Sequence, residues 1–150
     1  MMRYKYLQHR FVEHIPEQLE PGVLYISMPY ATAAHSCCCG CGEEVVTPFT
    51  PTDWKMTFDG ENVSLRPSIG NWNLPCRSHY VIEQGAVVEV EPWTPDEIQG
   101  EYRRDRAAKA EFYGRRSSEQ PAIEAEASSS SSSRPPSRWQ RAWSCIREKC

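Results

Sequence analysis

The sequence has no run of about 18 apolar residues, so it has no segment that could form a transmembrane helix. Its first residues, MMRYKYLQHRF, contain no apolar stretch of the kind found in secretory signals. It also has no excess of positive charge, because 17 Lys and Arg face 20 Asp and Glu. That balance disfavours a nucleic-acid binder that relies on bulk charge. We therefore expect a cytoplasmic protein with no membrane span, for which nucleic acid is a poor candidate partner.

The charge is unevenly distributed along the 150 residues. Residues 115–150 hold seven basic and four acidic side chains, which leaves 10 basic and 16 acidic side chains for residues 1–114. Within the basic part, residues 128–133 are six consecutive serines and Pro135 and Pro136 follow. This composition cannot bury enough apolar surface to offset the entropy lost on ordering. The sequence predicts a domain over residues 1–114 and a mostly disordered tail over residues 115–150.

The last residues of the tail leave two alternatives open. Trp139, Trp143 and Ile146 share one helical stripe with arginines around it, a pattern typical of a short docking or membrane-surface helix. A helix this short is barely stable alone, so the simpler alternative is an unfolded terminus.

Within residues 1–114 the patterns predict a β-rich α+β domain built from hairpins. Runs of β-branched, aromatic or alternating residues, bounded by Gly, Asn and Asp, indicate strands. They occupy residues 23–27, 54–58, 63–65, 80–83 and 86–90, and we expect a loop over residues 67–75. Thr94, Pro95 and Glu97 form a helix start with a capping box. We expect this single C-terminal helix to stop at Gly114. The predicted fold is a small antiparallel sheet with one helix.

Cysteine is concentrated in one short segment. Of seven cysteines, four lie within HSCCCGCG at residues 35–42, and Cys76 follows in CRSH at residues 76–79. An odd number, tight clustering and the absence of a secretory signal argue against a disulfide framework. Glycines between the cysteines let the backbone fold so that several thiolates reach one ion. Soft thiolates with an imidazole favour zinc, so the sequence predicts a zinc site that staples the sheet.

More candidate ligands are present than the four that a structural zinc needs. The candidate metal ligands are Cys37, Cys39, Cys41, Cys76 and His79. Spacing favours the set Cys39, Cys41, Cys76 and His79, with Cys37 as the first replacement. Cys38 is expected to point away from the ion.

A second, weaker pattern suggests nucleophilic catalysis. Ser68 could act as a nucleophile with His35 or His79 as the base, and Asp53 or Asn71 could orient the imidazole. If His79 binds the metal, His35 is the remaining base, so the candidate catalytic set is Ser68, His35 and Asp53. Backbone N–H groups near Gly70 could stabilise an oxyanion. The competing interpretation is that Ser68 and Asp53 cap turns, that Asn71 takes a turn conformation and that Trp72 fills the core. The sequence around Ser68 is not a GxSxG motif.

Five motifs make the chain resemble a family of small bacterial proteins that share a domain of unknown function. The shared strings are HxCxCGCG, PTDW, TFDG, VSLxPSIGNW and CRSHY, and they fall within residues 30–42, 46–54, 57–60, 63–72 and 76–80. The resemblance covers roughly residues 9–113. The family string CxCGCG matches Cys37, Cys39 and Cys41 and leaves Cys38 at a variable position.

The resemblance implies a place in a pathway. Genes of this family are neighbours of bacterial ubiquitin-like modifiers and of their activating and conjugating enzymes, which implies a role in conjugation, with antiphage defence as one setting. The sequence analysis ranks first a zinc-binding accessory protein that binds the modifier or its enzymes. The alternative is a serine-type peptidase that processes or removes the modifier, with Ser68 as the nucleophile.

Overall fold

The computed structural model describes residues 1–119. Met1–Ala108 forms one compact unit, which holds all the described strands. A second unit begins at Lys109, and its described part is the C-terminal end of the helix. The predicted disorder of the tail after residue 119 and the tryptophan stripe near its end lie outside the described residues.

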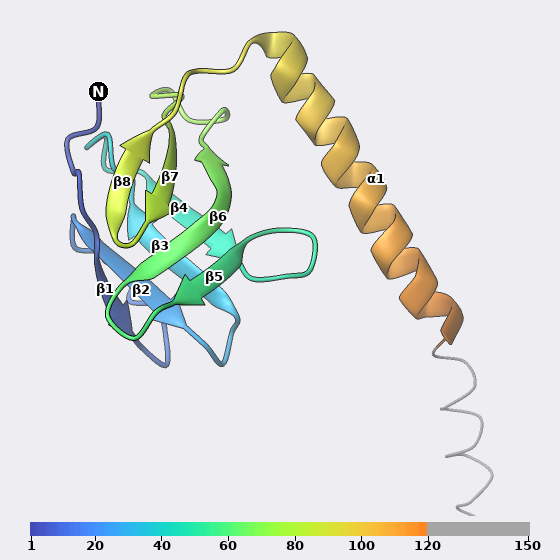
Figure 1. Cartoon of the computed structure of the whole chain (residues 1–150), viewed down its shortest axis with the longest axis horizontal. Helices are drawn as coiled ribbons and strands as arrows, with labels where there is room; N and C mark the ends of the chain where they lie inside the picture. The colour runs from blue at the N-terminus through green and yellow to red at the C-terminus, as the bar shows by residue number, and fades with distance from the viewer. Residues whose placement is uncertain (120–150) are drawn as a thin grey trace, which may run out of the picture. The chain divides into compact units, whose positions relative to one another are not determined.

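Eight strands and one helix make up the described chain (Figure 1). The strands are β1 (Gln8–Phe11), β2 (Val23–Ser27), β3 (Thr32–Ser36), β4 (Glu44–Pro48), β5 (Lys55–Phe58), β6 (Val63–Gly70), β7 (His79–Glu83) and β8 (Ala86–Glu89). The helix is α1 (Pro95–Glu119). None of the helical structure within residues 1–119 is long and apolar enough to cross a membrane.

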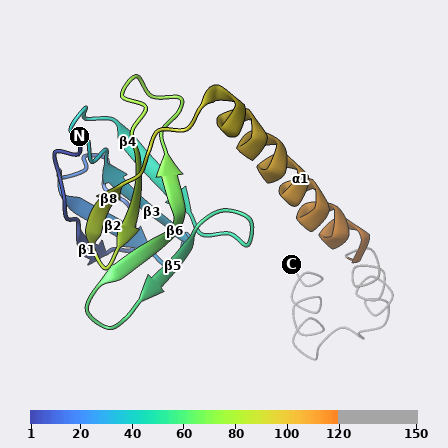
Figure 2. The same cartoon turned by 45° about the horizontal axis from the view of Figure 1, so that its top comes forward.

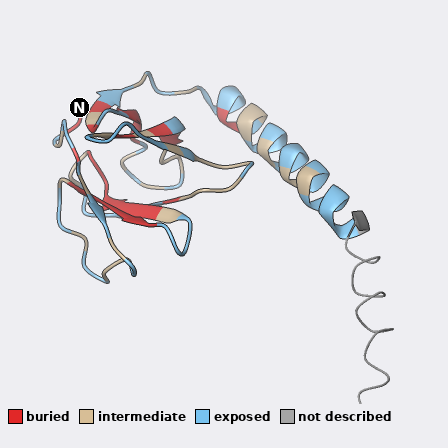
Figure 3. Cartoon of the chain, turned by 60° about the horizontal axis from the view of Figure 1, so that its bottom comes forward, coloured by how far each residue is buried: buried red, intermediate tan, exposed pale blue. Residues whose placement is uncertain are grey.

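The strands form two four-stranded sheets, ordered β1-β2-β3-β4 and β5-β6-β7-β8. Every pair is antiparallel except β1 and β2, which are parallel. The sheets lie face to face (Figure 2), and apolar residues from both form one core. Leu24 and Ile26 come from the first sheet, and Leu65, Tyr80 and Ile82 from the second; all are at most 1% exposed. Burial is concentrated between the layers (Figure 3), as expected for a β-sandwich.

The predicted β-rich class with one C-terminal helix is confirmed, and so are the strand at Val23–Ser27 and the hairpin of β7 and β8. The prediction of one sheet was wrong, because the chain builds two. The first sheet depends on β1, β3 and β4, which the sequence analysis did not expect. The sequences of β1 (QHRF) and β3 (TAAHS) are poor in the β-branched and aromatic residues that indicate strands, and tertiary pairing holds them instead.

Two predicted boundaries also move. Strand β6 continues through Pro67 to Gly70, where a loop was expected, and its register with β7 shifts between Leu65 and Ile69. Helix α1 begins as predicted, since the Thr94 N–H donates to Glu97 Oε2 at 2.7 Å. It passes through Gly114, whose helix penalty of about 1 kcal/mol does not end it.

Candidate active site and metal centre

A serine and a histidine lie in hydrogen-bond contact on neighbouring strands. Ser68 Oγ in β6 lies 2.9 Å from Nε2 of His79, the first residue of β7. The other ring nitrogen, Nδ1, lies 2.8 Å from the backbone carbonyl oxygen of Glu91. That oxygen can only accept a hydrogen bond, so Nδ1 carries the proton in the neutral ring. Nε2 therefore presents its lone pair to the Ser68 hydroxyl, as a general base requires.

The pairing of β6 with β7 places Ser68 and His79 close together. Gly70 is opposite His79, and Ser68 lies two residues before Gly70 on the same face of the strand. Ser68 and His79 are thus diagonal neighbours across two strands, within reach of a long side chain. Bulges commonly re-aim side chains beside active sites. The absence of a side chain at Gly70 matters here, because an added Cβ would overlap the Trp72 indole.

Two tryptophans enclose the imidazole. The ring centroids of Trp72 and Trp93 lie 4.9 Å and 5.1 Å from that of His79, and the two indoles stack on each other. His79 is only 3% exposed. The two indoles shield the imidazole from water and fix the plane of its ring.

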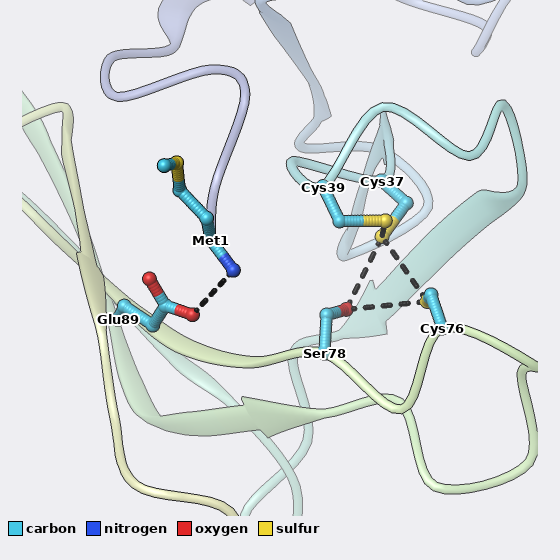
Figure 4. A network of polar contacts seen from close by, with 6 residues as sticks. All are labelled: Met1, Cys37, Cys39, Cys76, Ser78 and Glu89. Atoms are coloured by element: carbon cyan, nitrogen blue, oxygen red, sulfur yellow. Dashed lines mark hydrogen bonds and ion pairs between the residues drawn. The ribbon is translucent and has the colours of Figure 1, made fainter.

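Four cysteines from two segments of the chain converge on one point. The Sγ atoms of Cys37, Cys39, Cys41 and Cys76 all lie within 4.8 Å of one another. Cys37 Sγ lies 3.4 Å from Cys39 Sγ and 3.9 Å from Cys76 Sγ (Figure 4). A tetrahedral zinc with bonds of about 2.3 Å separates its sulfurs by roughly 3.8 Å, so this donor set fits that ion.

The thiols of this cluster favour different protonation states. Burial raises the pKa of Cys39 and Cys41. Burial also opposes ionisation of Cys76, but hydrogen bonds from Ser78 and from neighbouring thiols outweigh it and lower the Cys76 pKa to about 7. One thiolate is therefore easily formed, and a bound divalent cation would supply the charge that ionises the rest.

Ser78 and Asn71 connect the cysteines to the strand that carries His79. Ser78 Oγ lies 3.2 Å from Cys37 Sγ and accepts a 2.8 Å hydrogen bond from Asn71 Nδ2. The Asn71 N–H also donates to the Ser78 carbonyl at 2.9 Å. The ring of contacts closes the 71–78 loop directly before His79.

The residues that the sequence singled out lie in different surroundings. Ser68 pairs with His79 through the contact described above. His35 is fully buried, with Nε2 2.8 Å from the Tyr80 hydroxyl, and Asp53 accepts a hydrogen bond from Thr50. The geometry thus favours His79 over His35 as the base, and it favours Cys37 over His79 as the fourth metal ligand. Cys38, whose pKa burial raises to about 12, is not among the four converging cysteines.

Burial of His35 predicts a pH-dependent stability. Burial lowers its pKa from 6.5 to about 4, so between these values the unfolded chain binds a proton that the folded chain does not. Stability is then fully present above pH 6.5 and falls by about 3 kcal/mol as the pH drops to 4. Urea unfolding at several pH values between 4 and 6.5 measures the free energy of unfolding over this range. We expect this free energy to depend less steeply on pH in His35→Gln than in the wild-type protein. His14→Gln, at an exposed position, should keep the wild-type pH dependence, and the same pH dependence in all three proteins would refute the effect.

Comparison with known families gives this geometry a context. Residues 11–90 match the model of a family described as bacterial ubiquitination-like system serine protease, BubE. The chain belongs to this family. The matched range contains Ser68, His79 and all four converging cysteines. The resemblance to a small bacterial family linked to ubiquitin-like conjugation is thereby confirmed. Searches among curated proteins and solved structures gave no match.

Sequence reasoning missed several parts of the candidate site. The carbonyl of Glu91 faces Nδ1 of His79 where Asp53 or Asn71 was considered as the orienting group. A main-chain acceptor leaves no trace in the residue types, so no sequence signal could have found it. Trp72 was read only as a core residue, and Trp93 was not considered.

Proposed function

We propose that this protein is a serine peptidase that processes or removes the ubiquitin-like modifier of its pathway. Ser68 is the nucleophile and His79 the general base. The observation that carries the proposal is the 2.9 Å contact between Ser68 Oγ and His79 Nε2, with Nδ1 held by the Glu91 carbonyl. The family description as a serine protease supports the same reaction class.

The reaction follows from the tautomer. His79 Nε2 removes the hydroxyl proton while Ser68 Oγ forms a bond to the substrate carbonyl carbon. The imidazolium then donates that proton to the leaving group, whose bond to the acyl carbon breaks. Water, deprotonated by the same nitrogen, hydrolyses the acyl-enzyme and restores Ser68. The Glu91 carbonyl holds the ring in place throughout, and Trp72 and Trp93 pack against it.

We propose zinc as the ion of the four-cysteine cluster and a structural role for it. Thiolates prefer zinc to magnesium or calcium, and four cysteines leave no open position for a substrate or water. The ion would join the 37–41 segment to Cys76, three residues before His79. In a reducing compartment such as the cytoplasm the described cysteines stay available as thiols.

The sequence analysis ranked an accessory binding role first. The Ser68–His79 contact and the family description favour the peptidase instead. Both alternatives require binding of the modifier, and they differ in turnover.

Turnover of a modifier fusion tests the proposal. The substrate is the ubiquitin-like modifier of the pathway joined through its C-terminal tail to a fluorescent protein. We expect the wild-type protein to release the fluorescent protein and Ser68→Ala to lose at least 1,000-fold in rate. Ser64→Ala, on the same strand, is the control and should keep the wild-type rate. Capture of the fusion without cleavage by the wild-type protein would support the accessory role instead.

A further inference from the structure

One edge of the first sheet is open for pairing. Strand β4 is the last strand of its sheet and pairs only with β3. Hydrogen bonds from Cys37 N to Glu43 O and from Phe49 N to Ala31 O lie at the two ends of this ladder. Because bonded and non-bonded pairs alternate in an antiparallel ladder, Val45 and Thr47 bond to β3. The N–H and C=O groups of Glu44 and Val46 therefore point away from β3, toward the open edge.

A second open edge lies in the other sheet. Strand β5 pairs with β6 only from Val63 to Arg66, so no described strand covers that side of β6 farther along. Asn71 N donates to Ser78 O, which makes the adjacent pair of Gly70 and His79 a non-bonded one. The Gly70 N–H and C=O thus point away from β7, toward the side that β5 leaves uncovered.

The two edges border one groove. A cavity of about 260 Å³ is lined by Glu44, Val45 and Val46 from β4 and by Ile69 and Gly70 from β6. The loop after Gly70, including Trp72 and Leu74, completes the wall together with Trp54. The lining is mainly apolar. The outward-pointing N–H and C=O groups of Glu44 and Val46 in one sheet and of Gly70 in the other border it. A polypeptide in extended conformation satisfies such groups by adding a strand.

The groove lies beside the catalytic pair, because its lining residues Ile69 and Gly70 follow Ser68 along β6. Ile69 directly follows Ser68, and Gly70 lies two residues, roughly 7 Å, farther along β6. A peptide that lies along the edge of β6 passes Gly70 and reaches the Ser68 hydroxyl next. Glu44 is the single charged residue among the lining residues, so this wall repels an acidic segment.

We propose that this groove binds the extended tail of the polypeptide substrate as an added strand on β4 and delivers its scissile carbonyl to Ser68. This inference rests on the proposed function and names the substrate conformation and the residues that hold it. The occupant is the non-acidic segment on the acyl side of the scissile bond. The N–H and C=O of Glu44 and Val46 pair with its backbone.

Proline at position 46 tests the backbone pairing. Val46 is 51% exposed and its N–H is not used by β3, so Val46→Pro removes an outward donor and spares the β3–β4 ladder. We expect kcat/KM on the modifier fusion to fall about tenfold, because the substrate loses one main-chain hydrogen bond and its carbonyl is displaced by the proline ring. Val88→Ala, at a valine of similar exposure on β8 that does not line the groove, is the control and is expected within about twofold of wild type.

A small fluorophosphonate that needs no groove separates the two claims. We expect Val46→Pro to react with it at the wild-type rate. Val46→Trp fills the groove with a bulky side chain at an exposed position, and it should also lose cleavage while it keeps labelling. Cleavage by both Val46 variants at the wild-type rate would overturn the groove and leave the peptidase intact. A wild-type protein that neither labels nor cleaves would instead overturn the proposed function, and the groove with it.

Discussion

We expect the replacement of His79 by glutamine to lower the rate of modifier cleavage by about 1,000-fold. Glutamine can still hydrogen-bond to Ser68 and to the Glu91 carbonyl, but it cannot take up the hydroxyl proton. The loss is therefore chemical, and we expect it in kcat more than in KM. Steady-state kinetics with the modifier fusion measure both constants.

The double variant Ser68→Ala with His79→Gln makes this prediction sharper. Residues that act as one catalytic unit are not additive, so the double variant should be no slower than Ser68→Ala alone. His14→Gln, at an exposed position, controls for the loss of an imidazole and should match wild type. Losses that multiply in the double variant would mean that the two residues act independently, against the 2.9 Å contact.

We expect removal of a metal bound by the four cysteines to unfold the β-sandwich. The cluster joins the 37–41 segment, next to β3, to Cys76 beside β7, so an ion bound there would tie the two sheets together. Structural zinc sites contribute roughly 10 kcal/mol or more to folding, which is as large as the whole stability of a typical domain. We expect a strong chelator to abolish the cooperative thermal transition, and zinc to restore it. Calorimetry with and without the chelator measures this.

Two cysteine variants assign the ligands. Cys76→Ala should lose the bound zinc and the folded state, whereas Cys38→Ala should retain one zinc per chain and lose only about 1 kcal/mol from packing. Elemental analysis of the purified proteins checks the stoichiometry. Full zinc content in Cys76→Ala, or an unchanged melting temperature after chelation, would contradict the four-cysteine site. The affinity of the cluster for zinc should also weaken as the pH falls, because protons compete with the ion for the thiolates.

The fold was predictable where local pattern and tertiary structure agree. VLYIS at Val23–Ser27 is β-branched and aromatic, and it becomes a central strand. The hairpin of β7 and β8 shows the same agreement around Gln84 and Gly85, both at positive φ. Strand β3 was not predictable, because TAAHS has weak strand propensity and depends on pairing with both neighbours.

The sequence predicts which residues could form the candidate site, but it does not predict which of them contact one another. The cysteine cluster is visible in the sequence because its members are close together and separated by glycine. Whether Cys37 or His79 completes it depends on how the 37–41 segment and β7 are placed in the fold, which no local pattern encodes. The fold brings His79 to Ser68 and leaves Cys37 beside Cys39 and Cys76. The same limit applies to the groove, which depends on two sheet edges from distant segments.

The most direct test of the catalytic pair is the site of covalent modification by a fluorophosphonate. A hydroxyl reacts with this reagent only when a neighbouring base activates it, so labelling reports the state of Ser68 without knowledge of the substrate. The account predicts one adduct per chain in the zinc-loaded protein, located on Ser68 by peptide mass spectrometry and lost in His79→Gln. An unmodified Ser68 in a folded, zinc-loaded protein would contradict it.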